Sequence, residues 1–244
     1  MTVAGGSGSR DDNDFGIRIS SRRTVRTGRY ATIGADPAHA RRVWFALHGY
    51  GQLAARFLRP FAGIVPADTC VVAPEGLSRF YHEMPRADGA HLQRVGATWT
   101  TRDGRELDIP DTQAWLDGVY DEVMAPGIAA GAPAACGVLG FSQGMATAMR
   151  WVADGAVRPD CFVGWAGGLA ADVQQERFAA GVAEARVVLV AGESDSFATA
   201  TARASVLKGM RRLHRDTREI VFAGGHHLDP GVLTMLLEEL PLND

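Results

Sequence analysis

The chain has 244 residues, of which 46% are hydrophobic and 22% charged, so it is long enough to bury a full core. Its three cysteines are too few for a disulfide framework, and its net charge of −3 gives no overall basic field for nucleic acid or acidic lipid. No apolar run approaches the roughly 18 residues that span a bilayer, which excludes stable membrane insertion. We therefore expect a soluble, cytoplasmic globular protein.

The first residues differ in composition from the rest of the chain. Residues 1–16 are rich in Gly, Ser and Asp and lack the apolar centre of a secretory signal, which predicts a flexible tail. Five arginines follow between Arg18 and Arg29, and they fit either a basic patch for an acidic partner or, as we favour, a strand pair with a solvated arginine face. We expect an antiparallel hairpin over residues 22–33 and one domain over residues 17–244.

Beyond residue 43, short apolar runs alternate with longer amphipathic segments. The runs lie at 43–47, 69–73, 135–141, 161–165, 187–191 and 219–222, and the helix-like segments at 54–64, 111–128, 143–153, 174–183, 199–214 and 230–240. Apolar runs without strict alternation are typical of strands covered on both faces. The pattern predicts an α/β fold with a mostly parallel central sheet and helices on both faces.

One stretch interrupts this alternation. Residues 76–110 show no clear periodicity, although they contain Phe80, Tyr81 and Trp99. Long irregular loops in compact domains are usually functional or disordered, and the aromatic content argues against disorder. We expect a loop that covers the substrate, with the three aromatic side chains as candidate walls of an acyl pocket or, alternatively, as core packing.

A candidate nucleophile lies between a predicted strand and a predicted helix. The sequence Gly140-Phe-Ser142-Gln-Gly144 fits the pattern G-x-S-x-G and occupies the turn between the segments 135–141 and 143–153. The glycines permit a tight turn, and the serine projects at a helix N-terminus, where free N–H groups favour negative charge. Ser142 is therefore the predicted nucleophile.

A serine nucleophile needs a base, and the chain has seven histidines. His226 follows the last predicted strand, so it lies at the same sheet edge as Ser142. His227 is the adjacent alternative, and neighbours in an extended loop point in different directions. We favour His226. The pair could also ligate zinc, but no HExxH-type or cysteine set accompanies it, so we expect no metal.

The base in turn needs a carboxylate that fixes its tautomer. Asp195 follows the predicted strand at 187–191, again at a carboxyl end, and the order Ser142, Asp195, His226 is that of the α/β-hydrolase triad. Glu193 is the main alternative and Asp172 a poorer one. We predict Asp195 as the third member.

The fourth component follows the strand at 43–47. The segment Leu47-His48-Gly-Tyr50-Gly has glycines that let backbone N–H groups turn toward a developing oxyanion. We predict the N–H groups of Tyr50 and Gln143 as the oxyanion hole. In this setting His48 more plausibly braces the loop than acts as a base.

Together these motifs resemble the phospholipase/carboxylesterase family of α/β hydrolases, which includes the acyl-protein thioesterases. The matching segments are LHGYG (47–51), APEG (73–76), GFSQG (140–144), the Gly-x-x-Asp at 192–195 and GGHHLDP (224–230); SRFYHE (78–83) and RVGATW (94–99) resemble a set of bacterial esterases in that group. The resemblance implies the α/β-hydrolase fold without a large cap domain. It also implies Ser142, Asp195 and His226 as the triad and Tyr50 and Gln143 as the oxyanion hole.

The expected activity is hydrolysis of a small-molecule ester or thioester with a short to medium acyl chain, through an acyl-enzyme and without a cofactor. A monomer or homodimer would suffice. An amidase, peptidase or lactone hydrolase on the same fold, and a non-catalytic binding protein, are the alternatives, because fold alone does not decide chemistry.

Overall fold

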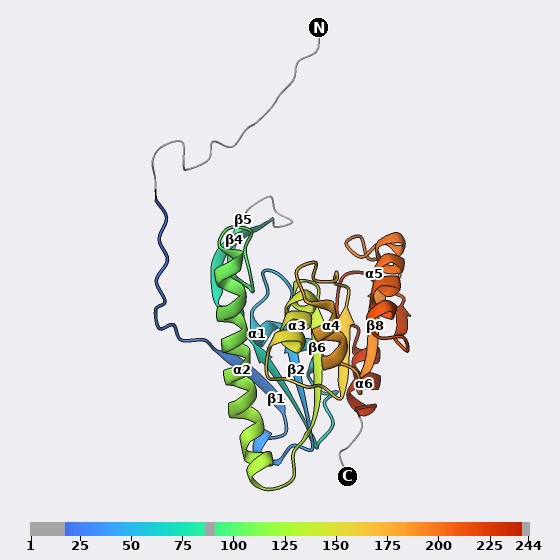
Figure 1. Cartoon of the computed structure of the whole chain (residues 1–244). Coiled ribbons are helices and arrows are strands. Elements are labelled where there is room, and N and C mark those ends of the chain that lie inside the picture. Colours follow the sequence, from blue (N-terminus) through green and yellow to red (C-terminus); the bar gives the residue numbers. More distant parts are fainter. Residues whose placement is uncertain (1–17, 86–90, 241–244) are drawn as a thin grey trace.

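A computed structural model describes residues 18–85 and 91–240, so the tail expected over residues 1–16 lies outside the described residues. A seven-stranded sheet forms the centre of the molecule (Figure 1). Its strands, in spatial order, are β1 (Tyr30–Gly34), β3 (Thr69–Pro74), β2 (Arg42–Leu47), β6 (Ala135–Phe141), β7 (Cys161–Trp165), β8 (Arg186–Gly192) and β9 (Arg218–Phe222). All neighbours pair in parallel except β1, which runs antiparallel to β3. The mostly parallel sheet is as predicted.

Helices cover both faces of this sheet. One face packs against α2 (Arg105–Ala129), α3 (Gln143–Asp154), α4 (Gln175–Gly181) and α5 (Ala200–Leu213); the other packs against α1 (Ala54–Phe57), a 3-10 turn at Arg59–Phe61 and α6 (Pro230–Glu238). A further 3-10 turn, Pro37–His39, precedes β2. Successive strand residues face opposite layers: in β2, Trp44 belongs to one core cluster and Phe45 to the other. Burial on both sides explains why the strand sequences are apolar without alternation.

The N-terminal edge of the sheet differs from the prediction. The hairpin expected over residues 22–33 is absent from the described chain: Tyr30–Gly34 forms a single strand that pairs with β3, and residues 18–29 have no regular secondary structure. The predicted antiparallel edge therefore exists, but its partner is distant in sequence. Gly34 ends the strand at a φ of 100°, a conformation that suits glycine.

The stretch 76–110 is more ordered than predicted. It forms a two-stranded antiparallel hairpin, β4 (Ser78–Pro85) and β5 (His91–Thr98), followed by the start of α2. This helix begins at Arg105 rather than at Asp111, because Gly104 provides the cap position in the left-handed region and the helix accommodates Pro110 in its second turn. The hairpin and α5 stand on opposite sides of the view in Figure 1, at the carboxyl ends of the parallel strands.

A further helical segment also differs from expectation. The helix predicted over 54–64 is a short α1 followed by the 3-10 turn, since Pro60 supplies no N–H to continue an α-helix. The longest helix, α2, has 25 residues, but no helix within the described ranges combines the length and apolarity needed to cross a membrane.

Candidate active site

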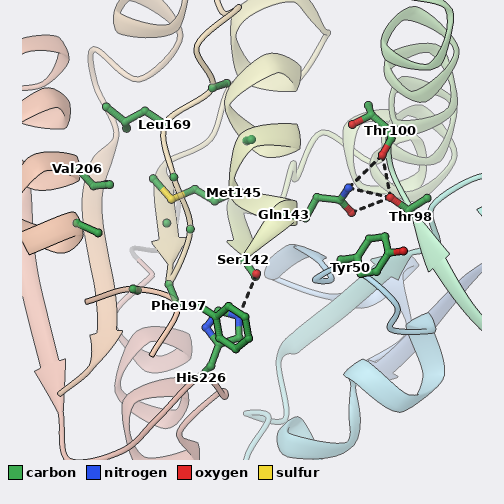
Figure 2. A pocket seen from close by; sticks show the side chains of 18 of the residues that line it. Tyr50, Thr98, Thr100, Ser142, Gln143, Met145, Leu169, Phe197, Val206 and His226 are labelled. Carbon is green, nitrogen blue, oxygen red and sulfur yellow. Dashed lines mark hydrogen bonds between the residues drawn. The ribbon is translucent and has the colours of Figure 1, made fainter. Parts of the chain in front are cut away.

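Ser142 occupies a strained turn between β6 and α3. Its φ of 53° and ψ of −117° are unusual for a residue with a side chain. Its N–H donates to the carbonyl of Trp165 at 2.8 Å, which fixes the turn against β7. The turn directs the hydroxyl away from the sheet into a cavity (Figure 2). Such strain persists only where the surroundings hold it, and it is common at functional sites.

The two flanking glycines are required by close packing. A Cβ on Gly144 would lie 2.2 Å from the carbonyl oxygen of Leu47, and one on Gly140 would lie 2.5 Å from Cα of Met145. The first contact brings the N-terminus of α3 against the end of β2. The G-x-S-x-G spacing therefore allows the serine turn and the loop after β2 to lie side by side.

His226 and Asp195 complete a chain of polar contacts that begins at Ser142. Nε2 of His226 lies 3.0 Å from Oγ of Ser142, and Nδ1 lies 2.8 Å from Oδ2 of Asp195. The ring of His226 packs between Phe141 and Phe197, with centroid distances of 4.9 Å to each. This geometry suits a base that accepts the serine proton at Nε2 while Nδ1–H donates to the carboxylate.

The carboxylate of Asp195 is held in the ionised form. Burial of its fully enclosed side chain raises the pKa of this carboxyl, but hydrogen bonds from the N–H groups of Ala198 and Phe197 and from His226 outweigh burial, so the net pKa lies below its usual value. The carboxylate therefore remains charged at neutral pH, as an orienting group for an imidazolium requires.

The alternative base, His227, and the alternative carboxylates, Glu193 and Asp172, are exposed or have other partners. The ring of His227 packs against Phe222, and the carbonyl of His227 accepts a hydrogen bond from the indole of Trp165. Glu193 is exposed. Asp172 forms ion pairs of 3.0 Å with Arg105 and 2.7 Å with Arg150.

The predicted oxyanion-hole residues, Tyr50 and Gln143, line the same cavity as Ser142. Gln143 is the first residue of α3, so its N–H has no acceptor within the helix, and the hydrogen bonds of the described chain include none from the N–H of Tyr50 or Gln143. The Gln143 side chain donates from Nε2 to Thr98 Oγ1 at 2.8 Å and to the carbonyl of Thr100 at 3.2 Å (Figure 2). These bonds tie the start of α3 to the end of β5. N–H groups without another acceptor are the donors that an oxyanion hole uses.

His48 braces the loop that carries Tyr50. Its Nδ1–H donates to the carbonyl of Gly49 at 2.8 Å, and its Nε2 accepts from the N–H of Gly76 at 3.0 Å. The bond accepted at Nε2 requires the neutral ring. Burial lowers the pKa of His48 to about 4, and the hydrogen bond to the Gly49 carbonyl, which favours the protonated ring, offsets only part of that effect. The histidine is fully buried and lies outside the Ser142 contact chain.

The lowered pKa of His48 predicts a loss of stability in acid. The unfolded ring takes up a proton below pH 6.5, whereas the folded ring stays neutral down to about pH 4. Because the unfolded state binds more protons in this window, the free energy of unfolding falls as the pH drops from about 6.5 to about 4. Urea unfolding across this window should show a shallower pH dependence for His48→Gln than for the wild type.

The matched control for this measurement is His39→Gln, which removes an exposed histidine from the 3-10 turn before β2. Its pH dependence should follow the wild type. An equal slope for His48→Gln and the wild type would contradict the assignment of His48 as a buried neutral brace.

A cavity of about 1000 Å³ opens above Ser142. On one side of the serine it is lined by apolar and small residues; we call this part the apolar arm, formed by Met145, Gly164, Leu169, Leu189, Ala202 and Val206. Figure 2 shows Met145, Leu169 and Val206 on that side and Tyr50, Gln143, Thr98 and Thr100 on the other. An ion pair of 3.2 Å between Arg203 and Glu219, which also line the cavity, adds charge beside α5.

The three aromatic residues singled out in the sequence have different positions. Phe80 lines the cavity and stacks on Tyr50 with a centroid distance of 5.0 Å. Trp99 is 1% exposed and packs against the ring of His48, to whose carbonyl it donates a hydrogen bond of 2.7 Å. Tyr81 is 72% exposed and lines a separate depression. Thus Phe80 alone of the three contacts the cavity, and Trp99 supports the loop of His48 from the core.

Comparison with known proteins was made for the sequence and for the fold. The sequence matches no protein-family model and no curated protein. Among solved structures, acyl-protein thioesterase 2 from Zea mays aligns with a TM-score of 0.61 and 15% identity, covering 87% of this chain and 97% of that chain. A carboxylesterase from Mesorhizobium loti aligns with a TM-score of 0.61 and 18% identity, covering 87% and 95%. A phospholipase/carboxylesterase from Dyadobacter fermentans aligns with a TM-score of 0.59 and 15% identity, covering 89% and 98%.

These alignments span most of both chains and, at such identities, establish the architecture. The chain has the α/β-hydrolase fold. Within this fold Ser142, Asp195 and His226 follow β6, β8 and β9, so all three lie at the carboxyl ends of the strands. The fold class inferred from the alternating apolar runs is confirmed.

The covering of the site in this α/β-hydrolase fold is slight. Only residues 166–174 connect β7 to α4, so no large cap domain arises there, and among the described residues the hairpin β4–β5 lies outside the central sheet.

The groups of His, Cys, Asp and Glu in the described ranges include none arranged to hold a metal ion. Cys70, Cys136 and Cys161 are buried, and burial raises the pKa of each thiol.

Several contributors to the site carry no sequence signal. Phe197 is 79% exposed yet packs on the ring of His226, and Thr98 anchors the Gln143 side chain from the end of β5. Leu169 and Val206 line the apolar arm from a loop and from α5. Each is an ordinary residue type in an ordinary local pattern, so only their three-dimensional positions reveal them.

Proposed function

We propose that this protein is a serine hydrolase of the phospholipase/carboxylesterase family that cleaves small-molecule esters or thioesters with short to medium acyl chains, as a cytoplasmic monomer or homodimer. The observation that carries the proposal is the pair of contacts at His226, 3.0 Å to Ser142 Oγ and 2.8 Å to Asp195 Oδ2. Structural neighbours that bear the names thioesterase and carboxylesterase support the reaction class.

The reaction has two steps. His226 Nε2 accepts the proton of Ser142 as Oγ bonds to the acyl carbonyl carbon, and the resulting oxyanion accepts hydrogen bonds from the N–H groups of Tyr50 and Gln143. The carbon–oxygen or carbon–sulfur bond then breaks, and His226 returns the proton to the departing alkoxide or thiolate. Water attacks the acyl-enzyme with His226 as base, and Ser142 Oγ leaves and regains its proton.

The apolar arm is the part of the cavity suited to the acyl chain. The side chains of Met145, Leu169 and Val206 give it apolar walls. Burial of each methylene contributes about 0.8 kcal/mol, so affinity rises with chain length along the arm, while the charged Arg203–Glu219 pair lines the same cavity. A longer chain would need to desolvate that pair, which favours short to medium acyl groups.

The test is a series of p-nitrophenyl esters from acetate to palmitate, together with an acyl thioester of medium length. We expect hydrolysis with the highest kcat/KM at short to medium chains. In the variant Val206→Phe, the added ring fills part of the apolar arm, so the optimum should move toward acetate.

A matched control is Val221→Phe, which changes an exposed valine of β9 that does not line the cavity. Its chain-length profile should equal that of the wild type. Absence of hydrolysis across the whole series would refute the proposed activity. A palmitate optimum, or an unchanged profile in Val206→Phe, would refute the acyl assignment of the apolar arm.

A further inference from the structure

A second depression adjoins the catalytic cavity and is rich in arginine. It measures about 910 Å³ and shares Arg79 and Phe80 of β4 with the first cavity, so the two are neighbours at this strand. We call it the arginine groove; it is lined by Arg29, Leu53, Arg56, Arg59, Arg79, Phe80, Tyr81, Gln93, Arg94 and Val95. No acidic side chain is among these lining residues. The groove is therefore a local cationic surface on a chain whose net charge is −3.

Among the ion pairs of the described residues, only one of the five groove arginines has a carboxylate partner. Arg29 pairs with Glu75 at 2.6 Å, and Glu75 also accepts from the N–H of Ala54 at 3.1 Å, which joins the chain before β1 to the start of α1. For the other four arginines of the groove, the ion pairs found in residues 18–85 and 91–240 include no carboxylate partner. Gathering such charges costs electrostatic free energy, which an anionic ligand would recover.

Three arginines of the catalytic cavity, Arg105, Arg150 and Arg203, differ in this respect, whereas Arg102 and the shared Arg79 have no carboxylate partner among the ion pairs of the described residues. Arg105 and Arg150 share the carboxylate of Asp172 at 3.0 and 2.7 Å, so their charge is partly neutralised before any ligand binds. The larger group of arginines without a carboxylate partner in the described residues is therefore that of the arginine groove, which adjoins the cavity at Phe80. The apolar arm lies on the other side of Ser142 (Figure 2).

We propose, on the basis of the hydrolase function proposed above, that the arginine groove binds the phosphate groups of the leaving group, so that the substrates are acyl esters or thioesters of a multiply phosphorylated alcohol or thiol. Guanidinium groups bind phosphate oxygens through paired, charge-assisted hydrogen bonds. The acyl chain occupies the apolar arm because its walls are hydrocarbon. The bond to be cleaved then lies at Ser142, and the carrier extends past Phe80 into the groove.

A binding measurement tests the groove independently of turnover. Pyrophosphate is titrated calorimetrically into the full-length Ser142→Ala protein and into the same protein carrying Arg56→Glu and Arg59→Glu. We expect binding to the first and a loss of affinity of roughly tenfold or more in the second. The matched control is Arg215→Glu, which reverses an exposed arginine between α5 and β9, at the opposite sheet edge from the groove, and should bind as the parent does.

Turnover tests the link to the leaving group. With the wild type, kcat/KM for butyryl-coenzyme A, whose carrier bears several phosphates, should exceed that for the butyryl thioester of N-acetylcysteamine, which is uncharged. The Arg56→Glu, Arg59→Glu protein should lower this ratio by roughly tenfold or more through KM, and Arg215→Glu should not.

The outcomes separate the two proposals. If neither thioester is cleaved but pyrophosphate binds through the groove, the hydrolase function fails and the anion site stands. If the uncharged thioester is cleaved equally well, or pyrophosphate does not bind, the phosphorylated carrier is refuted. Binding to phosphatidylglycerol vesicles without binding to pyrophosphate would also refute it, in favour of a membrane surface.

Discussion

Replacement of Ser142 by alanine is expected to lower kcat for ester hydrolysis by roughly 10⁴- to 10⁶-fold, because it removes the hydroxyl that lies 3.0 Å from Nε2 of His226. The variant should also lose covalent labelling by a fluorophosphonate probe. Alanine has a Cβ atom as serine does, so the steric strain at a φ of 53° is unchanged and the backbone turn should be preserved. The measurements are steady-state kinetics and labelling of both proteins.

Thermal unfolding provides the control for this variant. The midpoint of Ser142→Ala should lie close to that of the wild type, since the change removes one hydroxyl and no packing group. A second control is Ser194→Ala, which removes a hydroxyl that donates to the carbonyl of Gly224 on the neighbouring loop. That variant should still label. Equal labelling of Ser142→Ala and the wild type would show that the nucleophile lies elsewhere.

Asp195→Asn should lower kcat by roughly 10⁴-fold while leaving substrate binding nearly intact. The amide keeps the shape of the carboxylate but can donate to Nδ1 of His226, which favours the tautomer whose Nε2 carries a proton and cannot accept one from Ser142. The loss should appear in kcat more than in KM, because Asp195 has no surface in the apolar arm. Kinetics at a pH well above the lowered pKa of this carboxyl give the comparison.

Glu193→Gln is the matched control for Asp195→Asn, since it makes the same carboxylate-to-amide change two residues earlier in the chain. Glu193 is exposed, and its backbone N–H donates to Phe222 whatever its side chain. Its activity should stay near that of the wild type. A large loss in Glu193→Gln together with a small loss in Asp195→Asn would reassign the carboxylate.

The parts of the fold that could be predicted from the sequence are those with local causes. Apolar runs such as Cys161–Trp165 are buried on both sides and read as strands without any knowledge of their neighbours. The turn at Ser142 could be predicted because its glycine spacing is visible in the local sequence, although only Gly140 is constrained by nearby residues and Gly144 is constrained by the distant Leu47. The positions of Asp195 and His226 after predicted strands then limited the choice of partners.

The hairpin β4–β5 escaped prediction because its causes are not local. Its pairing places Phe80 opposite Gly96, and a Cβ on Gly96 would lie 2.5 Å from the carbonyl oxygen of Gly51. The hairpin is thus shaped by packing on the loop after β2. Trp99 gave the same difficulty: its burial depends on the ring and carbonyl of His48, which are distant in sequence.

The sheet order has a consequence for how the site is assembled. Ser142 and His226 are separated by 84 positions and His226 and Asp195 by 31, yet each follows a strand of the run β6-β7-β8-β9. A slip of one residue between β8 and β9 would carry His226 about 3.3 Å along the strand and break its 2.8 Å contact with Asp195. Reaction with the fluorophosphonate probe therefore depends on the correct register of β8 and β9. A chain that misaligns the last strand is expected to be partly folded but not to react with the probe.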